Sequence, residues 1–227
     1  MKYLISLLVG MFVGVVLFVL GLYFNPFVDT PRVSPLAVSD LDLIDLSYSL
    51  VASESIVFTN DGESHVKPHP ARVLELWEPT IIRTRGFVTI LTDSRGEPAG
   101  LGVKFSSDSE ETALLGGKVL VASVWHIYLQ DRGTMLIDQT ENIWRYVHDI
   151  VIPARLSSGD NWRGTWYGLI TAGPGALGTA RVTVNTGVLS GTEAEAVESI
   201  TAKAYSSITG PVGMTGNLTI ALPREEE

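Results

Sequence analysis

The amino-acid sequence predicts a mainly β domain, an antiparallel sandwich or barrel of about ten short strands with one helix, behind a single N-terminal transmembrane helix. An uncharged apolar stretch covers residues 3–22. After Leu43, apolar and polar residues alternate with the period of two that a half-buried strand requires. Turns rich in glycine and proline separate the alternating segments. These observations together favour a membrane-anchored β protein.

The first stretch has the length of a membrane span. As a helix, residues 3–22 rise by about 30 Å, the thickness of a bilayer's hydrocarbon core. A cleaved signal sequence is the alternative, but its apolar run is usually about 7–15 residues long and ends in small residues. This run ends in Tyr23, Phe24 and Phe27, which suit the headgroup interface. The pattern favours a retained signal-anchor over residues 1–24.

The charges around the span indicate its orientation. Lys2 and the free amino terminus precede it, and the nearest cation on the other side is Arg32. The positive-inside rule therefore favours a cytoplasmic N-terminus and a periplasmic or extracellular C-terminal domain. Since the chain contains no cysteine, a bacterial-type inner (plasma) membrane fits slightly better than a eukaryotic one.

Ser6, Gly10 and Gly14 recur every four residues within the span and form one small-residue stripe. Small side chains let two helix backbones approach closely in lipid, so the stripe predicts a helix-helix contact, with a second copy or with another membrane protein. The alternative is that glycine is simply common in membrane helices.

Three regions follow the anchor. Residues 25–39 contain three prolines and predict a semi-extended spacer that holds the domain just off the bilayer. Residues 40–223 are long enough for one β-rich domain, and residues 224–227 form an acidic tail.

The composition excludes several kinds of function. The 227-residue chain carries a formal net charge of −9, which argues against nucleic acid as a partner and against a polybasic attachment to anionic lipid. Without cysteine, the chain has no disulfide framework, thiolate nucleophile or cysteine-ligated zinc.

The strand predictions follow from alternation and from β-branched or aromatic content. In residues 81–91, apolar side chains occupy the positions of both strand faces, which predicts that both faces are buried. Residues 109–115 predict one or two helical turns. The predicted strands are residues 43–50, 55–59, 71–77, 81–91, 100–105, 118–129, 133–137, 143–152, 166–171, 181–185 and 218–222.

Residues 192–206 fit two patterns. Thr192 and Glu195 make a capping box, and the alanine and glutamate content favours a helix. A strand remains the alternative, because apolar residues also recur with period two apart from a slip at Val197.

No convergent catalytic or metal-binding set is present in the sequence. His65 and His69 have metal-ligand spacing, but the neighbouring prolines place them in a loop. Ser64 and Lys67 have S-x-x-K spacing in the same loop, and there is no G-x-S-x-G motif. We therefore expect no metal and no cofactor, name no catalytic residue, and favour a non-enzymatic protein.

Two short motifs resemble known families. Gly164-Thr165-Trp166-Tyr167 resembles the opening strand motif of lipocalins, which implies a β-barrel carrier of an apolar ligand. Gly159-Asp160-Asn161, followed by Arg163, resembles a stretch of type I signal peptidases, which implies a membrane-anchored serine/lysine hydrolase with a site near residues 159–167. The nucleophile stretch of that family is not matched by Val33-Ser34-Pro35.

Trp162, Trp166 and Tyr167 are the candidate partner or ligand surface, because exposed rings can hold a protein, a glycan or a lipid headgroup. The alternative is that these rings fill the core. Alternation places Trp166 and Tyr167 on opposite faces of their strand, so part of the cluster at most is exposed.

The sequence thus predicts a single-pass membrane protein whose β domain works by binding, as an accessory or assembly subunit of a membrane complex. Its expected partners are the bilayer and either a membrane protein or a second copy. An anchored hydrolase and a lipocalin-like carrier are the alternatives.

Overall fold

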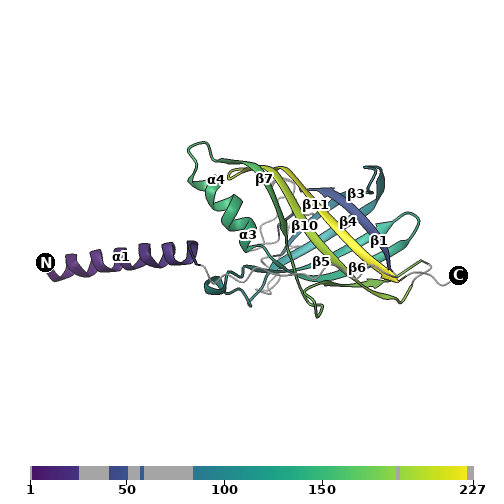
Figure 1. Ribbon diagram of the computed structural model, residues 1–227, viewed down its shortest axis with the longest axis horizontal. Helices are drawn as coiled ribbons and strands as arrows, with labels where there is room; N and C mark the ends of the chain where they lie inside the picture. Colours follow the sequence, from purple (N-terminus) through teal and green to yellow (C-terminus); the bar gives the residue numbers. More distant parts are fainter. Residues whose placement is uncertain (1, 26–40, 51–56, 59–83, 188–189, 224–227) are drawn as a thin grey trace, which may run out of the picture.

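A computed structural model of the chain describes residues 2–25, 41–50, 57–58, 84–187 and 190–223. Helix α1 (Lys2–Tyr23) projects from one end of a closed antiparallel barrel of eight strands (Figure 1). The prediction of a mainly β fold is confirmed, and its form is a barrel. The barrel strands are β1 (Leu41–Ser49), β3 (Arg85–Thr92), β4 (Pro98–Asp108), β5 (Leu120–Leu129), β6 (Gly133–Asn142), β9 (Ala180–Val184), β10 (Glu193–Ser206) and β11 (Gly210–Pro223).

Antiparallel pairing runs around the barrel in the order β1-β11-β10-β9-β6-β5-β4-β3. The barrel closes where Ser47 of β1 lies opposite Thr92 of β3, and the Thr92 hydroxyl donates to the Ser47 carbonyl at 3.1 Å. The short strand β2 (Val57–Phe58) adds to β3 beyond this closure. Closure leaves the barrel with few unpaired strand edges.

At the end nearest α1, β6 and β10 separate and pair with different partners. Strand β8 (Thr171–Gly173) pairs with β6, and β7 (Asn161–Leu169) pairs with β10. A continuous helical segment lies over this end (Figure 1). It consists of α3 (Trp144–Tyr146), a π-helical turn η4 (Val147–Val151) and α4 (Ile152–Leu156).

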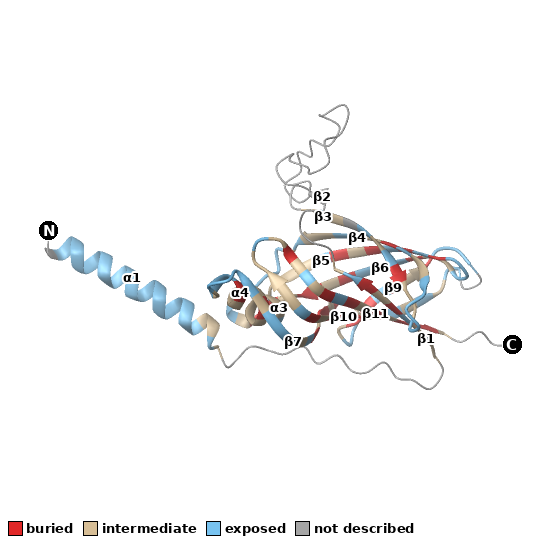
Figure 2. Ribbon diagram, turned by 90° about the horizontal axis from the view of Figure 1, so that it is seen from above, coloured by how far each residue is buried: buried red, intermediate tan, exposed pale blue. Residues whose placement is uncertain are grey.

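The core follows from the inward-facing residues of each strand (Figure 2). On β5 and β6 the inward residues are apolar far from α1 and polar nearer to it, as in the series Met135, Ile137, Gln139, Glu141. One apolar cluster fills the barrel interior around Trp125. A second apolar cluster forms under the helical segment around Ile150.

The prediction of a helix at residues 192–206 is wrong, because this segment is strand β10. Residues 196, 198, 200 and 202 are all buried, so the alternation has no slip at Val197. Glu198 occupies the inward position at which the sequence offered no apolar residue. The partners that stabilise its burial come from other strands.

The strand predicted at residues 143–152 is also wrong, because the chain is helical from Trp144 to Leu156. The Asn142 side chain, one residue before the N-cap Ile143, accepts from the backbone N–H of Trp144, the first residue of the helix, at 3.1 Å. Ile150 and Ala154, four residues apart, are both buried and form the apolar face of the segment. Pro153 is the second residue of α4, which directly follows the π-helical turn η4 within this continuous segment.

Several other predictions lie wholly or partly outside the described residues. These include the spacer from residue 26 onward, the strand at residues 71–77, the motifs around His65 and His69, and the acidic tail. Of the helical turns predicted at residues 109–115, only Leu114 and Leu115 are helical, as part of one 3₁₀ turn, η3 (Leu114–Gly116). Residues 3–23 of α1 are long and apolar enough to cross a membrane and are not buried by the protein; a signal sequence at this position has the same properties.

Candidate functional site

The barrel interior contains an ion network of one lysine and two glutamates. Lys104 comes from β4, Glu141 from β6 and Glu198 from β10, and all three side chains are buried. The Lys104 ammonium lies 2.8 Å from a carboxylate oxygen of each glutamate. Three strands that are distant in sequence therefore place opposite charges at the centre of the barrel. We call this set the interior network.

Polar side chains around Glu198 satisfy its remaining acceptor sites. The Tyr48 hydroxyl and the Gln139 amide donate to its carboxylate, and the Trp125 indole N–H donates at 3.0 Å. Its own backbone N–H donates to the Thr171 hydroxyl at 2.7 Å. Hydrogen bonds to the ionised form favour it, so Glu198 is held as a carboxylate.

Glu141 has fewer donors. Besides Lys104, the Ser123 hydroxyl and the Gln139 amide donate to the same oxygen, the latter at 3.1 Å. Among the described residues, the only buried side-chain nitrogen or oxygen atom without a hydrogen-bond partner is the Thr179 hydroxyl, which lies outside the network. The hydrogen bonds of Glu141 are therefore made within the barrel, and those from Lys104, Ser123 and Gln139 all reach one of its two carboxylate oxygens.

The electrostatics of the network differ between its two acids. Burial raises the pKa of Glu141, the Lys104 ammonium opposes this, and the Glu198 charge adds to it, with a raised pKa as the result. Burial would also raise the pKa of Glu198, but Lys104 and the surrounding donors lower it. Burial would lower the pKa of Lys104, but the two carboxylates raise it. Chemically, the network is one buried cation between two carboxyl groups, of which Glu141 takes up a proton more readily than Glu198.

Replacing Glu141 with glutamine is expected to change how stability depends on pH. Because the pKa of Glu141 is raised by folding, its contribution to stability is complete below its ordinary value of 4.5 and declines as the pH rises through the folded value. Glu141→Gln removes the titrating carboxyl and with it this loss of stability at higher pH. The urea midpoint of the variant, relative to wild type, should rise between about pH 4 and about pH 8 in full-length protein in mild detergent.

Glu198→Gln is the matched control, because the pKa of Glu198 shifts the other way. Its contribution is present above 4.5 and is lost as the pH falls through the folded pKa. The deficit of Glu198→Gln relative to wild type should therefore grow as the pH rises from the folded pKa to 4.5 and stay constant above 4.5, where the Glu141→Gln difference is still changing. A Glu141→Gln difference that stays constant with pH would contradict the assignment.

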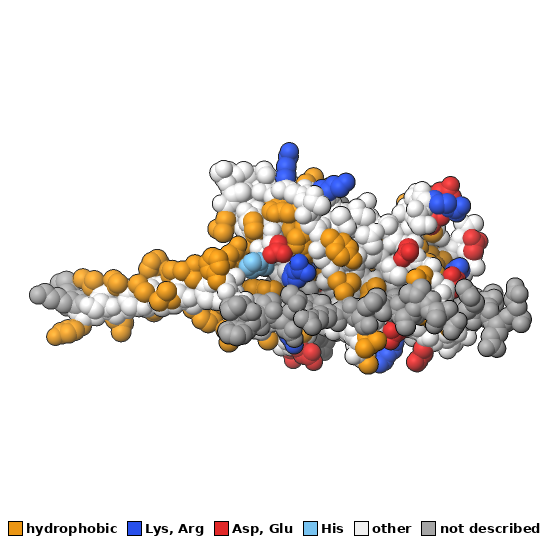
Figure 3. Space-filling view, viewed as in Figure 1, with side chains coloured by type: hydrophobic (Ala, Val, Ile, Leu, Met, Phe, Trp, Pro, Cys, Tyr) orange, Lys and Arg blue, Asp and Glu red, His pale blue; other side chains and the backbone are white. Residues whose placement is uncertain are grey.

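A pocket of about 440 Å³ lies at the end of the barrel opposite α1. Ile44, Leu46 and Leu129 are among its apolar lining residues. Charged side chains gather at this end (Figure 3), and those that line the pocket are Asp45, Asp93, Arg95, Glu97, Asp131 and Arg132. The backbone N–H groups of Glu97 and Arg95 donate to Asp93, which lowers its pKa. We call this cavity the mouth pocket.

The outer wall of the barrel carries an apolar surface across β3, β4, β5 and β6. Val88 and Ile90 of β3 are each 60% exposed. They lie opposite Val103 and Leu101 of β4, so their side chains share the outward face. The sequence predicted burial on both faces of this segment, and the described part of the chain covers only the inner one. The exposed apolar side chains of this wall face are Val88, Ile90, Leu101, Phe105, Tyr128 and Leu136.

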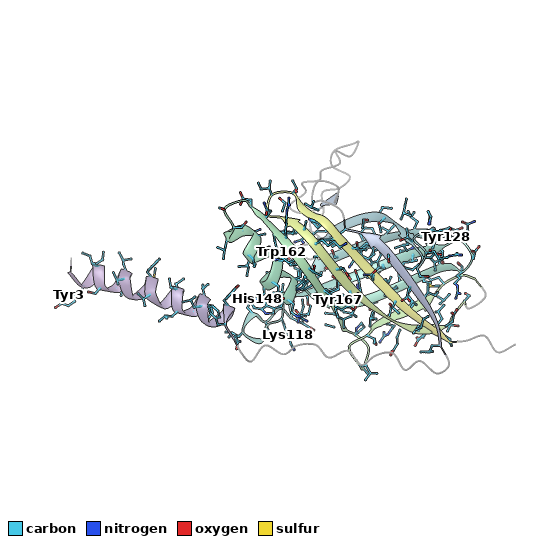
Figure 4. All side chains as sticks on the ribbon, turned by 45° about the horizontal axis from the view of Figure 1, so that its top comes forward. Tyr3, Lys118, Tyr128, His148, Trp162 and Tyr167 are labelled. Carbon is cyan, nitrogen blue, oxygen red and sulfur yellow. The ribbon has the colours of Figure 1, made fainter. Side chains whose placement is uncertain are left out.

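The structure divides the predicted aromatic site. Trp162 and Trp166 pack against the second apolar cluster, and the Trp166 indole donates to Asp149 at 2.9 Å. Tyr167 points to the opposite, exposed face (Figure 4). The neighbouring Tyr146 packs against Trp166 as well, and burial raises its pKa. Of the predicted set, Tyr167 is exposed, while Trp162 and Trp166 are half-buried.

The loop that resembles the signal-peptidase stretch is a turn between α4 and β7. The neighbouring Ser157 stabilises this turn: its hydroxyl lies 2.9 Å from the Ala154 carbonyl and 2.8 Å from the Asn161 carbonyl, and it accepts from the Asn161 N–H at 3.0 Å. The Ser207 hydroxyl lies 3.3 Å from the Asp160 carbonyl. Neither hydroxyl is hydrogen-bonded to a lysine or histidine among the described residues.

The two glycines of the small-residue stripe of α1 are not covered by the barrel domain. A Cβ atom built on Gly10 or Gly14 meets no neighbouring heavy atom within 4 Å. The membrane helix-helix contact predicted from Ser6, Gly10 and Gly14 stays a prediction. In the described part of the chain, no group of three or more histidine, cysteine, aspartate or glutamate residues is placed to hold a metal ion.

No known protein family matches this sequence, and no curated protein matches it either. The candidate site therefore rests on the geometry alone. Sequence reasoning missed the interior network and the mouth pocket. The one local signal was β6, where the inward series continues from Met135 and Ile137 into Gln139 and Glu141.

Proposed function

We propose that this protein is a single-pass membrane protein, anchored by α1 with a cytoplasmic N-terminus. Its barrel stands on the periplasmic or extracellular side of a bacterial-type inner membrane. There it binds another protein, as an accessory or assembly subunit of a membrane complex. The apolar wall face on β3–β6 is the observation that carries this proposal, because monomeric soluble proteins rarely expose a contiguous apolar area of this kind.

The direction of the wall face favours a protein as its occupant. The barrel extends along the line of α1 (Figure 1), so its walls face sideways when α1 crosses a bilayer. Lipid then lies beyond the end of the barrel, and a neighbouring extramembrane domain lies beside its wall.

A pull-down of tagged full-length protein in mild detergent tests this proposal. Ile90→Asp with Leu101→Asp places two charges on adjacent outward positions of the wall face. We expect a defined membrane protein to co-purify with wild type and to be lost from this variant, since a charge desolvated at an apolar interface is costly. Gly10→Leu with Gly14→Leu tests the contribution of the α1 stripe in the same way.

Val212→Asp is the matched control, because Val212 is a 66% exposed apolar residue on β11, outside the wall face. This variant should keep the partner. Circular dichroism confirms that each variant is folded. If wild type purifies alone, or if Val212→Asp loses the partner as completely as the wall-face variant, the proposal is wrong.

The mouth pocket favours a second candidate function, the binding of a small ligand. Its apolar lining and charged rim suit an amphipathic molecule, and the mouths of β-barrels commonly hold ligands. This is the carrier function that the resemblance to lipocalins implies. Mass spectrometry of an organic extract of the purified protein would detect such a ligand.

A further inference from the structure

We infer that η3 and the last turn of α1 form a membrane-contacting surface that seats the barrel directly on the bilayer. This inference rests on the proposed anchoring of α1 and adds a second contact with lipid, made by the barrel domain itself. The sequence predicted a spacer that holds the domain off the membrane. The contacts at the end of α1 point instead to a domain docked at the membrane surface.

The last turn of α1 is attached to the barrel domain through three contacts. The backbone oxygen of Tyr23 lies 3.0 Å from Nε2 of His148, and the two rings stack with centroids 4.4 Å apart. The Asn25 amide donates to the backbone carbonyl of Leu115 at 2.7 Å. In His148 the other ring nitrogen lies 2.7 Å from Asp149, so the ring is held from both sides.

These contacts determine how deep η3 lies relative to the bilayer. The apolar span of α1 ends at Tyr23. A bilayer has about 30 Å of hydrocarbon within a total of about 40–45 Å, so each headgroup layer is only about 5–8 Å thick. A residue that is hydrogen-bonded to Asn25 therefore lies at the level of this layer. Leu115 is that residue.

The side chains presented at this level are apolar. Leu115 is 69% exposed, and Leu114 and Phe24 are also exposed. Lys118 follows η3 and lies near the end of α1 together with His148 (Figure 4), where its ammonium is able to reach the headgroups. Glu110 and Glu111 precede η3 in the same connection, so the apolar side chains, rather than net charge, carry the contact.

The turn that presents these leucines is fixed by the barrel. Ala113 and Lys118 exchange two backbone hydrogen bonds at 2.9 and 3.1 Å, and Gly117 adopts the left-handed conformation between them, with φ of 64°. The Asn142 amide donates to the Gly117 carbonyl at 3.2 Å, and its oxygen accepts from the backbone N–H of Val119 at 3.2 Å. The exposed leucines are thus preorganised rather than located on a loose loop.

The absence of cysteine allows a direct test by single labels. Leu115→Cys, Val13→Cys and Tyr128→Cys are each labelled with a fluorophore in full-length protein and reconstituted at high lipid excess into phosphatidylcholine vesicles. Tyr128 is the matched control: it is 53% exposed and lies at the opposite end of the barrel (Figure 4). Val13 lies in the middle of the proposed span. Brominated acyl chains quench labels in lipid, and iodide quenches labels in water.

We expect brominated lipid to remove most of the emission at position 13, to reduce it less but clearly at position 115, which lies at the headgroup level, and to leave position 128 unchanged, while iodide quenches position 128. If position 13 is quenched by lipid but position 115 responds like position 128, the membrane contact of η3 is wrong and the anchor stands. If position 115 is protected from both quenchers, a protein covers η3 and the inference is wrong. If position 13 is not quenched by lipid, the proposed anchoring fails together with this inference.

Discussion

Replacing Lys104 with methionine is expected to lower the free energy of unfolding by about 3–5 kcal/mol, because it removes the only cation of the interior network. Methionine has a similar length, so the change is mainly one of charge. Glu141 and Glu198 then remain buried without a counter-charge, and at least one must take a proton for the barrel to stay folded. Urea unfolding of full-length protein in detergent, followed by tryptophan fluorescence, measures the loss.

Two further variants separate this charge effect from packing. Adding Glu141→Gln and Glu198→Gln to Lys104→Met removes the unpaired charges and should restore much of the lost stability. Arg95→Met removes an exposed cation that pairs with Asp93 on the surface and should cost less than about 1 kcal/mol. If the triple variant is no more stable than Lys104→Met alone, the charges are not the cause.

The parts of the fold that the sequence predicted are those determined by local alternation. The segment from Leu120 to Leu129 alternates between apolar inward residues and exposed outward ones except near Ser123, and it forms β5 nearly as predicted. The uncharged run ending at Leu22 forms α1. In both cases the environment of each side chain follows from its nearest neighbours along the chain.

The interior network escaped prediction because its members are distant in sequence. Lys104 and Glu198 are separated by 94 residues, and a glutamate within an alternating segment is normally assigned to the solvent face. Only the pairing of β4, β6 and β10 around one barrel makes its burial favourable. The same residue concealed the alternation of β10 and made the helix at residues 192–206 seem preferable.

The wall face shows a second case in which the local sequence pattern predicted the wrong environment for a side chain. Val88 and Ile90 made β3 look like a strand buried on both sides, and that expectation is not met within the described chain. A pattern read from one sequence does not distinguish burial by the same chain from burial by a partner. The apolar character of Val88 and Ile90 is thus visible in the sequence, but their exposure is visible only in the fold.

Replacing Trp125 with alanine is expected to lower the free energy of unfolding by about 3–5 kcal/mol, because Trp125 is the largest fully buried side chain among the residues that the structure describes. Its ring packs edge-on against Tyr48 at 4.9 Å between centroids, and its N–H donates to Glu198. The variant therefore creates a cavity and removes a donor from the interior network. The urea midpoint of the full-length protein, measured by circular dichroism, reports the loss.

Tyr128→Ala provides the comparison on the same strand. Tyr128 lies three residues from Trp125 on the outward face of β5 and is exposed, so its removal should change stability by no more than about 0.5 kcal/mol. If the two variants lose similar stability, Trp125 does not face the closed interior and the register of β5 is wrong. A large difference supports the barrel, because only closure of the sheet removes the Trp125 side chain from solvent on every side. The same variant also tests the wall face. If Tyr128→Ala keeps its stability but binds the partner less tightly, Tyr128 contributes to the interface and not to the stability of the fold.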